Sequence, residues 1–240
     1  MALRPAFRPI TAWSYSRYGK YKQCPYAFYC LYILKLPEPK GAALVRGAEV
    51  HDEAKFYLQN VTRIIPKSLK LFEPEIKRLR TKFKKEPGSV IVEDNWAFRA
   101  DWSGTQWNNW NDCWLRVKLD VAERDGNTVI ITDFKTGKFR SDNREDYMEQ
   151  LSLYGVAALT VFSHVSDLKV TTRLMYLDNG VVYPDKEEAP VYTAKDVRSM
   201  QKDWMKKVKP LFVDKTFAPK PNKWCYSCHY RKDNGGPCIY

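Results

Sequence analysis

Asp120, Asp133 and Lys135 lie on two consecutive segments that we expect to pair as an antiparallel hairpin. Because successive strand residues point to opposite faces, Asp133 and Lys135, two positions apart, project to the same side. Two carboxylates supply the hard oxygen ligands that Mg²⁺ and Mn²⁺ prefer, and the metal in turn activates water. A lysine beside them stabilises charge that develops on phosphate oxygens. These residues therefore suit metal-assisted hydrolysis of a phosphodiester bond.

The segments that carry these residues have the patterns of strands. Residues 115–122 alternate apolar and polar side chains, as in a half-buried strand. A turn at 125–127 leads to 129–135, a largely apolar run typical of a strand inside a sheet. On an exposed hairpin, Asp-Phe-Lys would be an ordinary surface ion pair. At the end of a buried strand, charged residues need a functional reason, which favours the catalytic interpretation.

Helices are expected on both sides of this hairpin in the sequence. Ser14 is placed to cap a helical segment that continues to about residue 34. The pattern predicts further helices at 42–59, 67–85, 145–162 and 194–208, a short strand within 90–100, and a strand hairpin at 169–177 and 181–183. We expect one domain over residues 1–240, with a mainly helical part at 14–89, the catalytic sheet and helix at 90–185, and a C-terminal helix with a cysteine cluster at 193–240.

Further motifs flank the hairpin in a definite order. Residues 46–51 are Arg-Gly-Ala-Glu-Val-His, residues 133–138 are Asp-Phe-Lys-Thr-Gly-Lys, and Gln150 and Tyr154 are four positions apart. In this order, and with Asp120 on the preceding strand, they resemble the RecB-like branch of the PD-(D/E)XK nuclease superfamily. The resemblance implies an α/β fold with a restriction-endonuclease-like core, in which helices flank a mixed sheet.

The resemblance also implies roles for the conspicuous polar residues. His51, Asp120 and Asp133 would hold Mg²⁺ or Mn²⁺, and Lys135 would assist the attacking water and stabilise the transition state. Imidazole is itself a common metal ligand. Gly47, one turn before His51, is small enough to permit a close approach of the helix.

Four other positions bear on the same site. Gln150 and Tyr154 share one face of their expected helix, and the resemblance implies that they position the substrate or the lysine. The chain departs from the family at Val117, where relatives often have glycine; this changes backbone freedom but removes no ligand. Glu93, on the preceding strand, resembles an acidic position of the family and is a further candidate for a metal role.

The cysteines point to a metal site rather than to disulfides. Residues 1–18 lack the apolar segment and the cleavage site of an export signal, so a disulfide framework is not expected. Cys225-x-x-Cys228 and Cys238 supply three soft ligands near the C-terminus, and a closed tetrahedral zinc site or a cubane cluster needs a fourth.

The sequence Cys-Pro-Tyr-Ala-Phe at Cys24 resembles the N-terminal motif of iron–sulfur members of the RecB-like family. These members include AddB-type recombination nucleases and CRISPR-associated RecB-like nucleases. The resemblance implies that Cys24, Cys225, Cys228 and Cys238 bind a [4Fe–4S] cluster that joins the two ends of the chain. Zinc is the main alternative, because Cys-x-x-Cys alone does not distinguish the metals. Cys30 and Cys113 are expected to be buried thiols.

The charge balance favours a polyanionic partner. The chain has 40 Lys and Arg against 28 Asp and Glu, a net charge of +12, although a generic soluble surface would have the same property. Hydrophobic residues make up 44% of the chain, as in globular proteins, and no apolar run is long enough to span a membrane. We expect a cytoplasmic protein, in the host cytoplasm if it is viral.

Aromatic residues near two segments have alternative interpretations. The tyrosines at 15, 18 and 21, with Lys22, would suit stacking on single-stranded bases or ordinary core packing. Trp102, Trp107 and Trp110 would line a strand channel or fill a small apolar cluster.

The expected function is metal-dependent hydrolysis of DNA, most consistent with an exonuclease that acts on single strands or free ends. One alternative is a nuclease subunit of a recombination or CRISPR-adaptation complex, with a helicase or recombination protein as partner. Another is a non-catalytic DNA-binding protein on the same fold, which the complete set of motifs argues against. An RNA-directed enzyme is a third interpretation.

Overall fold

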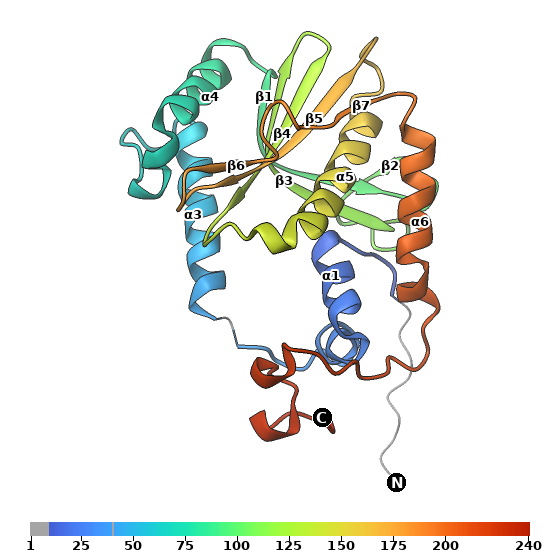
Figure 1. Cartoon of the computed structure of the whole chain (residues 1–240). Helices are drawn as coiled ribbons and strands as arrows, with labels where there is room; N and C mark the ends of the chain where they lie inside the picture. Colours follow the sequence, from blue (N-terminus) through green and yellow to red (C-terminus); the bar gives the residue numbers. More distant parts are fainter. Residues whose placement is uncertain (1–9, 40) are drawn as a thin grey trace.

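The computed structural model describes residues 10–39 and 41–240 as a mixed sheet between two layers of helices (Figure 1). Over these residues the sheet has seven strands in the order β2-β1-β3-β4-β5-β6, with β7 paired to β5. Strands β1 to β7 are, in chain order, Val90–Phe98, Gly104–Thr105, Leu115–Asp125, Thr128–Lys135, Lys169–Tyr176, Val181–Tyr183 and Val191–Thr193. The expected mixed α/β fold is confirmed.

The helices cover both faces of this sheet. The α-helices α1 to α6 are Tyr15–Gln23, Pro25–Phe28, Ala42–Leu58, Glu73–Lys85, Arg144–Val161 and Val197–Val213. Helices α3 and α4 pack on one face, whereas α5 and α6 pack on the other, with α1 against α6 (Figure 1). Since α5 crosses over between β4 and β5, these two strands run parallel, and the other paired strands are antiparallel.

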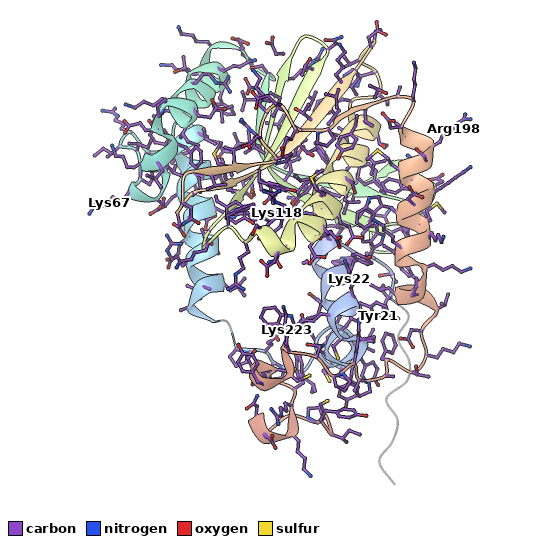
Figure 2. All side chains as sticks on the ribbon, viewed as in Figure 1. Tyr21, Lys22, Lys67, Lys118, Arg198 and Lys223 are labelled. Atoms are coloured by element: carbon purple, nitrogen blue, oxygen red, sulfur yellow. The ribbon has the colours of Figure 1, made fainter. Side chains whose placement is uncertain are left out.

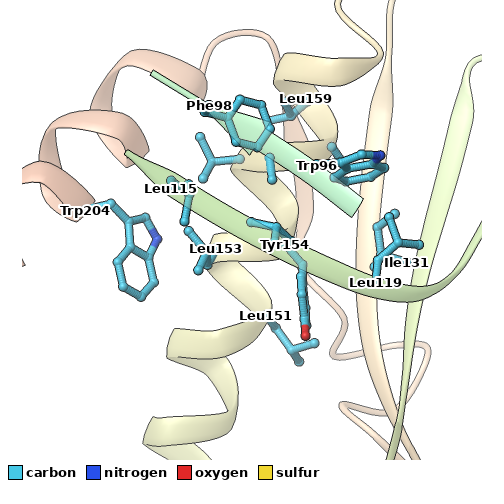
Figure 3. Close-up of a cluster of buried hydrophobic side chains, with 14 of the residues drawn as sticks. Trp96, Phe98, Leu115, Leu119, Ile131, Leu151, Leu153, Tyr154, Leu159 and Trp204 are labelled. Atoms are coloured by element: carbon cyan, nitrogen blue, oxygen red, sulfur yellow. The ribbon is translucent and has the colours of Figure 1, made fainter. Parts of the chain in front are cut away.

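The larger hydrophobic cluster lies between the sheet and helices α5 and α6. Trp96 and Phe98 of β1 pack there with Leu153 of α5 and Trp204 of α6, all almost fully buried (Figure 3). A smaller cluster joins α3 and α4 to the opposite face of the sheet, where Phe134 of β4 is buried. Burial of large aromatic side chains on both faces fixes the position of the strand ends that carry the polar residues.

Strand β3 does not keep the simple alternation expected for residues 115–122. Leu119 belongs to the larger cluster, but Val121 belongs to the smaller one on the opposite face. Strict alternation would place both on one face. The interruption falls at Asp120, which is buried although it was expected on the polar face.

Strand β1 changes faces at the matching position. Val92 packs in the smaller cluster and Trp96 in the larger one. Between them, Glu93 has a φ of 56°, in the left-handed region that residues with a side chain rarely adopt. The paired irregularities in β1 and β3 turn Glu93 and Asp120 out of the regular pleat.

Some element boundaries differ from those expected from the sequence. The segment expected as one helix at 67–85 begins with a 3₁₀ turn, Lys67–Phe72, and α4 follows with Pro74 in its first turn. Helix α6 begins later than expected and extends to Val213, with Pro210 inside it. Strand β7 was not predicted, because three residues carry no periodic signal. Among the described residues, no helix is long and apolar enough to cross a membrane.

The C-terminal segment packs against the N-terminal helices (Figure 1). Tyr230 is buried in a small cluster with Ala27 and Cys30. The hydroxyl of Tyr26 donates a 3.2 Å hydrogen bond to the Pro237 carbonyl, and the Asn222 side chain donates one of 3.0 Å to the Gln23 carbonyl. These contacts between protein atoms join the two ends of the described chain.

Candidate active site

His51 and Asp120 are in direct contact between helix α3 and strand β3. His51 Nδ1 lies 2.9 Å from Asp120 Oδ1. The other carboxylate oxygen, Oδ2, accepts a 2.7 Å hydrogen bond from the backbone N–H of Phe134. The β3–β4 pairing ends at Val121 and Thr132, so this N–H is available to a side chain. Asp120 is therefore held from two sides in a fixed orientation.

Glu93 completes a compact group of possible metal ligands. His51, Glu93 and Asp120 each offer a ligand atom, and these atoms all lie within 4.8 Å of one another. Glu93 comes into this group because the register of β1 and β3 sets it opposite Asp120. The side chain is further held by Lys118, whose Nζ lies 2.7 Å from Glu93 Oε2.

Asp133 and Lys135 lie beside this group on β4, on one side of the strand as expected. The Lys135 ammonium is 2.6 Å from Asp133 Oδ2. This contact is an ion pair by distance, whereas the buried Oδ2 accepts no hydrogen bond of ordinary geometry. Asp133 is not a member of the compact group of His51, Glu93 and Asp120.

Helix α5 presents Gln150 and Tyr154 to Asp133 on a single face. The Tyr154 hydroxyl donates a 2.6 Å hydrogen bond to Asp133 Oδ1. Gln150 Nε2 lies 3.4 Å from the same oxygen and donates a 3.1 Å hydrogen bond to the Tyr154 hydroxyl. The structure therefore brings together the seven polar residues of the site from five elements, α3, β1, β3, β4 and α5.

A second connection fixes helix α3 over the end of β4. Arg46 makes two hydrogen bonds of 2.8 and 2.6 Å to the Asp178 carboxylate in the turn after β5. Asp178 also accepts a 2.6 Å hydrogen bond from the backbone N–H of Gly137, whose φ of 87° favours glycine. At Gly47, by contrast, an added Cβ would lie 3.5 Å from Thr136 Oγ1, an ordinary contact, so this position does not require glycine for space.

Negative charge is concentrated in this buried region. Burial raises the pKa of Asp120, and the nearby Asp133 raises it too, although the hydrogen bond with His51 opposes the shift. Burial lowers the pKa of His51, but the hydrogen bond and charge of Asp120 outweigh it, so the net shift is upward. Burial and the charge of Asp133 raise the pKa of Tyr154 well above its ordinary value, which keeps its hydroxyl a donor.

The donor set fits a hard or borderline divalent cation. One imidazole nitrogen and two carboxylate oxygens lie within 4.8 Å of one another, and such ligands suit Mg²⁺ or Mn²⁺. The buried Oδ2 of Asp133, without a hydrogen bond of its own, is a further oxygen beside them. A cation would stabilise the charged form of Asp120, whose burial raises its pKa and otherwise favours the neutral form.

The four cysteines expected to bind a cluster all line one cavity of about 670 Å³ between the two ends of the chain: Cys24, Cys225, Cys228 and Cys238. Among the described residues, no three cysteine sulfurs lie within 4.8 Å of one another. The backbone N–H of Lys220 lies 3.5 Å from the sulfur of Cys24 and that of Asn222 lies 3.3 Å from the sulfur of Cys225.

The two remaining cysteines and most of the aromatic residues considered above pack in the interior. Cys30 and Cys113 are buried, as expected. The tyrosines of α1 pack against the larger cluster, and Lys22 is paired with Asp146 and Glu149, which favours core packing over base stacking. Trp102 is buried.

Comparison with known proteins places this geometry in a family. The sequence matches the PD-(D/E)XK nuclease superfamily over residues 12–232, and the chain belongs to this superfamily. Membership implies a metal-dependent nuclease, and His51, Glu93 and Asp120 form a possible metal site. Among solved structures, the chain is similar to the "Crystal structure of SSO0001", with 12% identity, coverage of 94% of this chain and 87% of that chain, and a TM-score of 0.39. The search of curated proteins found no match.

Proposed function

We propose that this protein is a Mg²⁺- or Mn²⁺-dependent nuclease of the RecB-like branch that hydrolyses DNA, as an exonuclease acting on single strands or free ends. The observation that carries the proposal is the convergence of His51, Glu93 and Asp120 beside the Asp133–Lys135 pair. A structural or purely binding surface has no need for three carboxylates and an imidazole gathered in a buried place.

Each residue has a definite task in this reaction. His51, Glu93 and Asp120 would hold the cation, with Asp133 next to them. The bound cation would lower the pKa of a water molecule and polarise the phosphate. Lys135, held at 2.6 Å from Asp133, would orient the attacking water and stabilise the added charge on the phosphate oxygens.

Tyr154 and Gln150 keep Asp133 in place during the reaction. Because both contact Oδ1, they direct Oδ2 toward Lys135. Water adds to phosphorus and gives up a proton to solvent as one P–O ester bond breaks, and the departing oxygen takes up a proton from solvent. Precise placement of these groups accounts for a large part of such rate enhancements.

The test is digestion of end-labelled single- and double-stranded DNA with Mg²⁺ or Mn²⁺, with an RNA of the same sequence as a third substrate. We expect metal-dependent cleavage of DNA that is lost in Lys135→Ala and Asp133→Ala and kept in Lys186→Ala, an exposed lysine in the loop between β6 and β7. The product ladder gives the polarity. If the folded wild type cleaves no DNA with either metal, or cleaves only RNA, the proposal is wrong.

We further propose that Cys24, Cys225, Cys228 and Cys238 bind a [4Fe–4S] cluster. Backbone N–H groups directed at two of these sulfurs support thiolate ligands. The choice of a cluster over zinc rests on the Cys-Pro-Tyr-Ala-Phe segment at Cys24, which resembles the iron–sulfur members of the family.

Metal content decides between the cluster and zinc. Protein purified without oxygen is expected to contain iron and sulfide and to absorb visible light. Cys24→Ser should lose iron and sulfide, whereas Cys113→Ala, which alters a buried thiol elsewhere, should keep them. Stoichiometric zinc without iron in the wild type would rule out the cluster.

A further inference from the structure

A cationic cavity adjoins the active site on the side of helix α1. Its volume is about 610 Å³, and Lys135, Gln150 and Tyr154 form part of its wall. Arg17 of α1 and Arg116 of β3 line the same cavity, together with Lys118, and no carboxylate does. The cavity therefore continues from the reacting end of β4 to a pair of arginines.

The two arginines differ from the two lysines in their partners. Lys118 is paired with Glu93 and Lys135 with Asp133. Among residues 10–39 and 41–240, neither Arg17 nor Arg116 has a carboxylate within ion-pair distance. The cavity thus contains two positive charges that the protein does not neutralise.

Both guanidinium groups are partly withdrawn from water and held by neutral groups. Arg17 Nη1 donates a 2.7 Å hydrogen bond to the Ala12 carbonyl, and Arg116 Nη2 donates to the Trp107 carbonyl. Arg116 Nε is buried and has no hydrogen-bond partner. Burial lowers the pKa of Arg17, and the positive charge of Arg116 lowers it too. Partly buried like charges and an unused N–H donor are costly unless an anion binds there.

Tryptophans hold Arg116 in its orientation. The guanidinium carbon lies 3.5 Å from the ring centroid of Trp110 and 4.7 Å from that of Trp107. Such cation–π contacts fix the planar group without consuming its charge. Trp107 and the hydroxyls of Ser14 and Ser16 also line the cavity, which adds a flat apolar surface and hydrogen-bonding groups next to the arginines.

Other basic residues are spread over the described part of the molecule (Figure 2). The labelled side chains Lys67, Arg198 and Lys223 in Figure 2 lie on widely separated parts of the molecule. Net charge alone would attract any polyanion, whereas the cavity combines unpaired arginines with the residues of the reaction. A guanidinium also matches the geometry of phosphate oxygens closely.

We propose that Arg17 and Arg116 bind a backbone phosphate of an unpaired DNA strand, next to the phosphate that is cleaved. The inference rests on the proposed nuclease function and specifies where its substrate lies. A cavity of about 610 Å³ accommodates a few groups of one strand and not a duplex. The arginines act by positioning the strand.

Binding of a fluorescein-labelled single-stranded oligonucleotide tests the proposal, with Ca²⁺ in place of the catalytic metal so that binding is measured without cleavage. Arg17→Gln and Arg116→Gln are each expected to weaken binding about tenfold, as for loss of a charged hydrogen bond. Each should also reduce the slope of log affinity against log salt by about 0.7. Arg124→Gln, an exposed arginine at the far end of the same strand, is the matched control and should change neither.

A neutral linkage in the DNA makes the test specific. Replacing the phosphate near the cleaved bond by a methylphosphonate should weaken binding to the wild type more than to Arg116→Gln, in which only Arg17 still contacts that phosphate, and should have no further effect on the double variant Arg17→Gln/Arg116→Gln. Arg116→Lys, which keeps the charge, should retain the salt slope, and near-ultraviolet circular dichroism verifies that each variant folds.

The outcomes separate this proposal from the nuclease itself. If the wild type cleaves DNA but both arginine variants bind and respond to salt like Arg124→Gln, the phosphate site is wrong and the nuclease stands. If the wild type shows the expected binding pattern but never cleaves, the nuclease is wrong and the phosphate site stands. Equal affinity for a blunt duplex closed by hairpins would overturn the restriction to unpaired strands.

Discussion

Glu93 lies opposite Asp120, because Val92 pairs with Val121 and Asp94 pairs with Leu119 on either side of them. The backbone of Glu93 adopts a φ of 56° at this point, and both strands change faces there. Unfavourable backbone conformations at non-glycine residues persist where the surrounding structure enforces them, and they concentrate at functional sites. The conformation turns the Glu93 carboxylate toward His51 and Asp120.

Substitution of Glu93 tests its place in the metal site. Glu93→Gln keeps the size of the side chain but removes a charged oxygen ligand, so we expect Mn²⁺ affinity to fall about tenfold or more. Isothermal titration calorimetry with Mn²⁺ measures the change. Glu188→Gln, at an exposed position in the loop between β6 and β7, is the control. Equal affinity in the two variants would exclude Glu93 as a ligand.

Tyr154→Phe tests the support of Asp133 from helix α5. The variant loses the 2.6 Å hydrogen bond to Asp133 Oδ1 and leaves only the 3.4 Å contact from Gln150. We expect kcat to fall about tenfold with little change in KM, since the lost contact orients a group and does not bind substrate. Tyr29→Phe, which leaves a ring stacked at 5.3 Å on Phe217, should keep full activity. An unchanged kcat in Tyr154→Phe would contradict this role.

Stability at low pH should depend on Glu75 of helix α4. The hydrogen bond to Arg78 lowers its pKa most, burial opposes this shift, and the hydrogen bond to Arg173 lowers it further. Together these effects lower the pKa from 4.5 to about 2. A folded-state pKa below the unfolded value stabilises the protein above the unfolded pKa, and this stabilisation is lost as the pH falls from about 4.5 toward about 2. After allowance for solvent screening, Glu75→Gln should lower the free energy of unfolding by about 1 kcal/mol at neutral pH.

Urea denaturation of Glu75→Gln and wild type across this pH range measures the effect. The difference in the free energy of unfolding between the two proteins should shrink as the pH falls toward about 2. A difference that stays constant with pH would show that the carboxylate charge is not its origin.

Two helical glycines should respond in opposite directions to alanine. At Gly155 of α5, a Cβ would lie 2.6 Å from the ring of Tyr192, so Gly155→Ala should destabilise the protein by about 1–3 kcal/mol. At Gly19 of α1 a Cβ would meet nothing within 4 Å, so Gly19→Ala should stabilise it by up to about 1 kcal/mol. Thermal denaturation measures both, and a stabilised Gly155→Ala would show that Tyr192 moves aside freely.

The sequence by itself determined the features that depend on local spacing. The i, i+4 separation of Gln150 and Tyr154 places them on one helix face, and the two-residue separation of Asp133 and Lys135 places them on one side of a strand. The hairpin of β3 and β4 and the parts of the chain that are helical follow from the same periodicities. These patterns are short-range, because a regular backbone repeats within a few residues.

Only the tertiary structure decided which distant residues meet. The place of Glu93 in the possible metal site depends on the β1–β3 register and on its left-handed backbone, neither of which has a periodic signal. The pairing of Arg46 with Asp178 and the cavity shared by Arg17 and Arg116 likewise join segments that are far apart in the chain. Such contacts are set by how the layers pack and where strand pairing ends, and packing is a property of the whole chain rather than of any one motif.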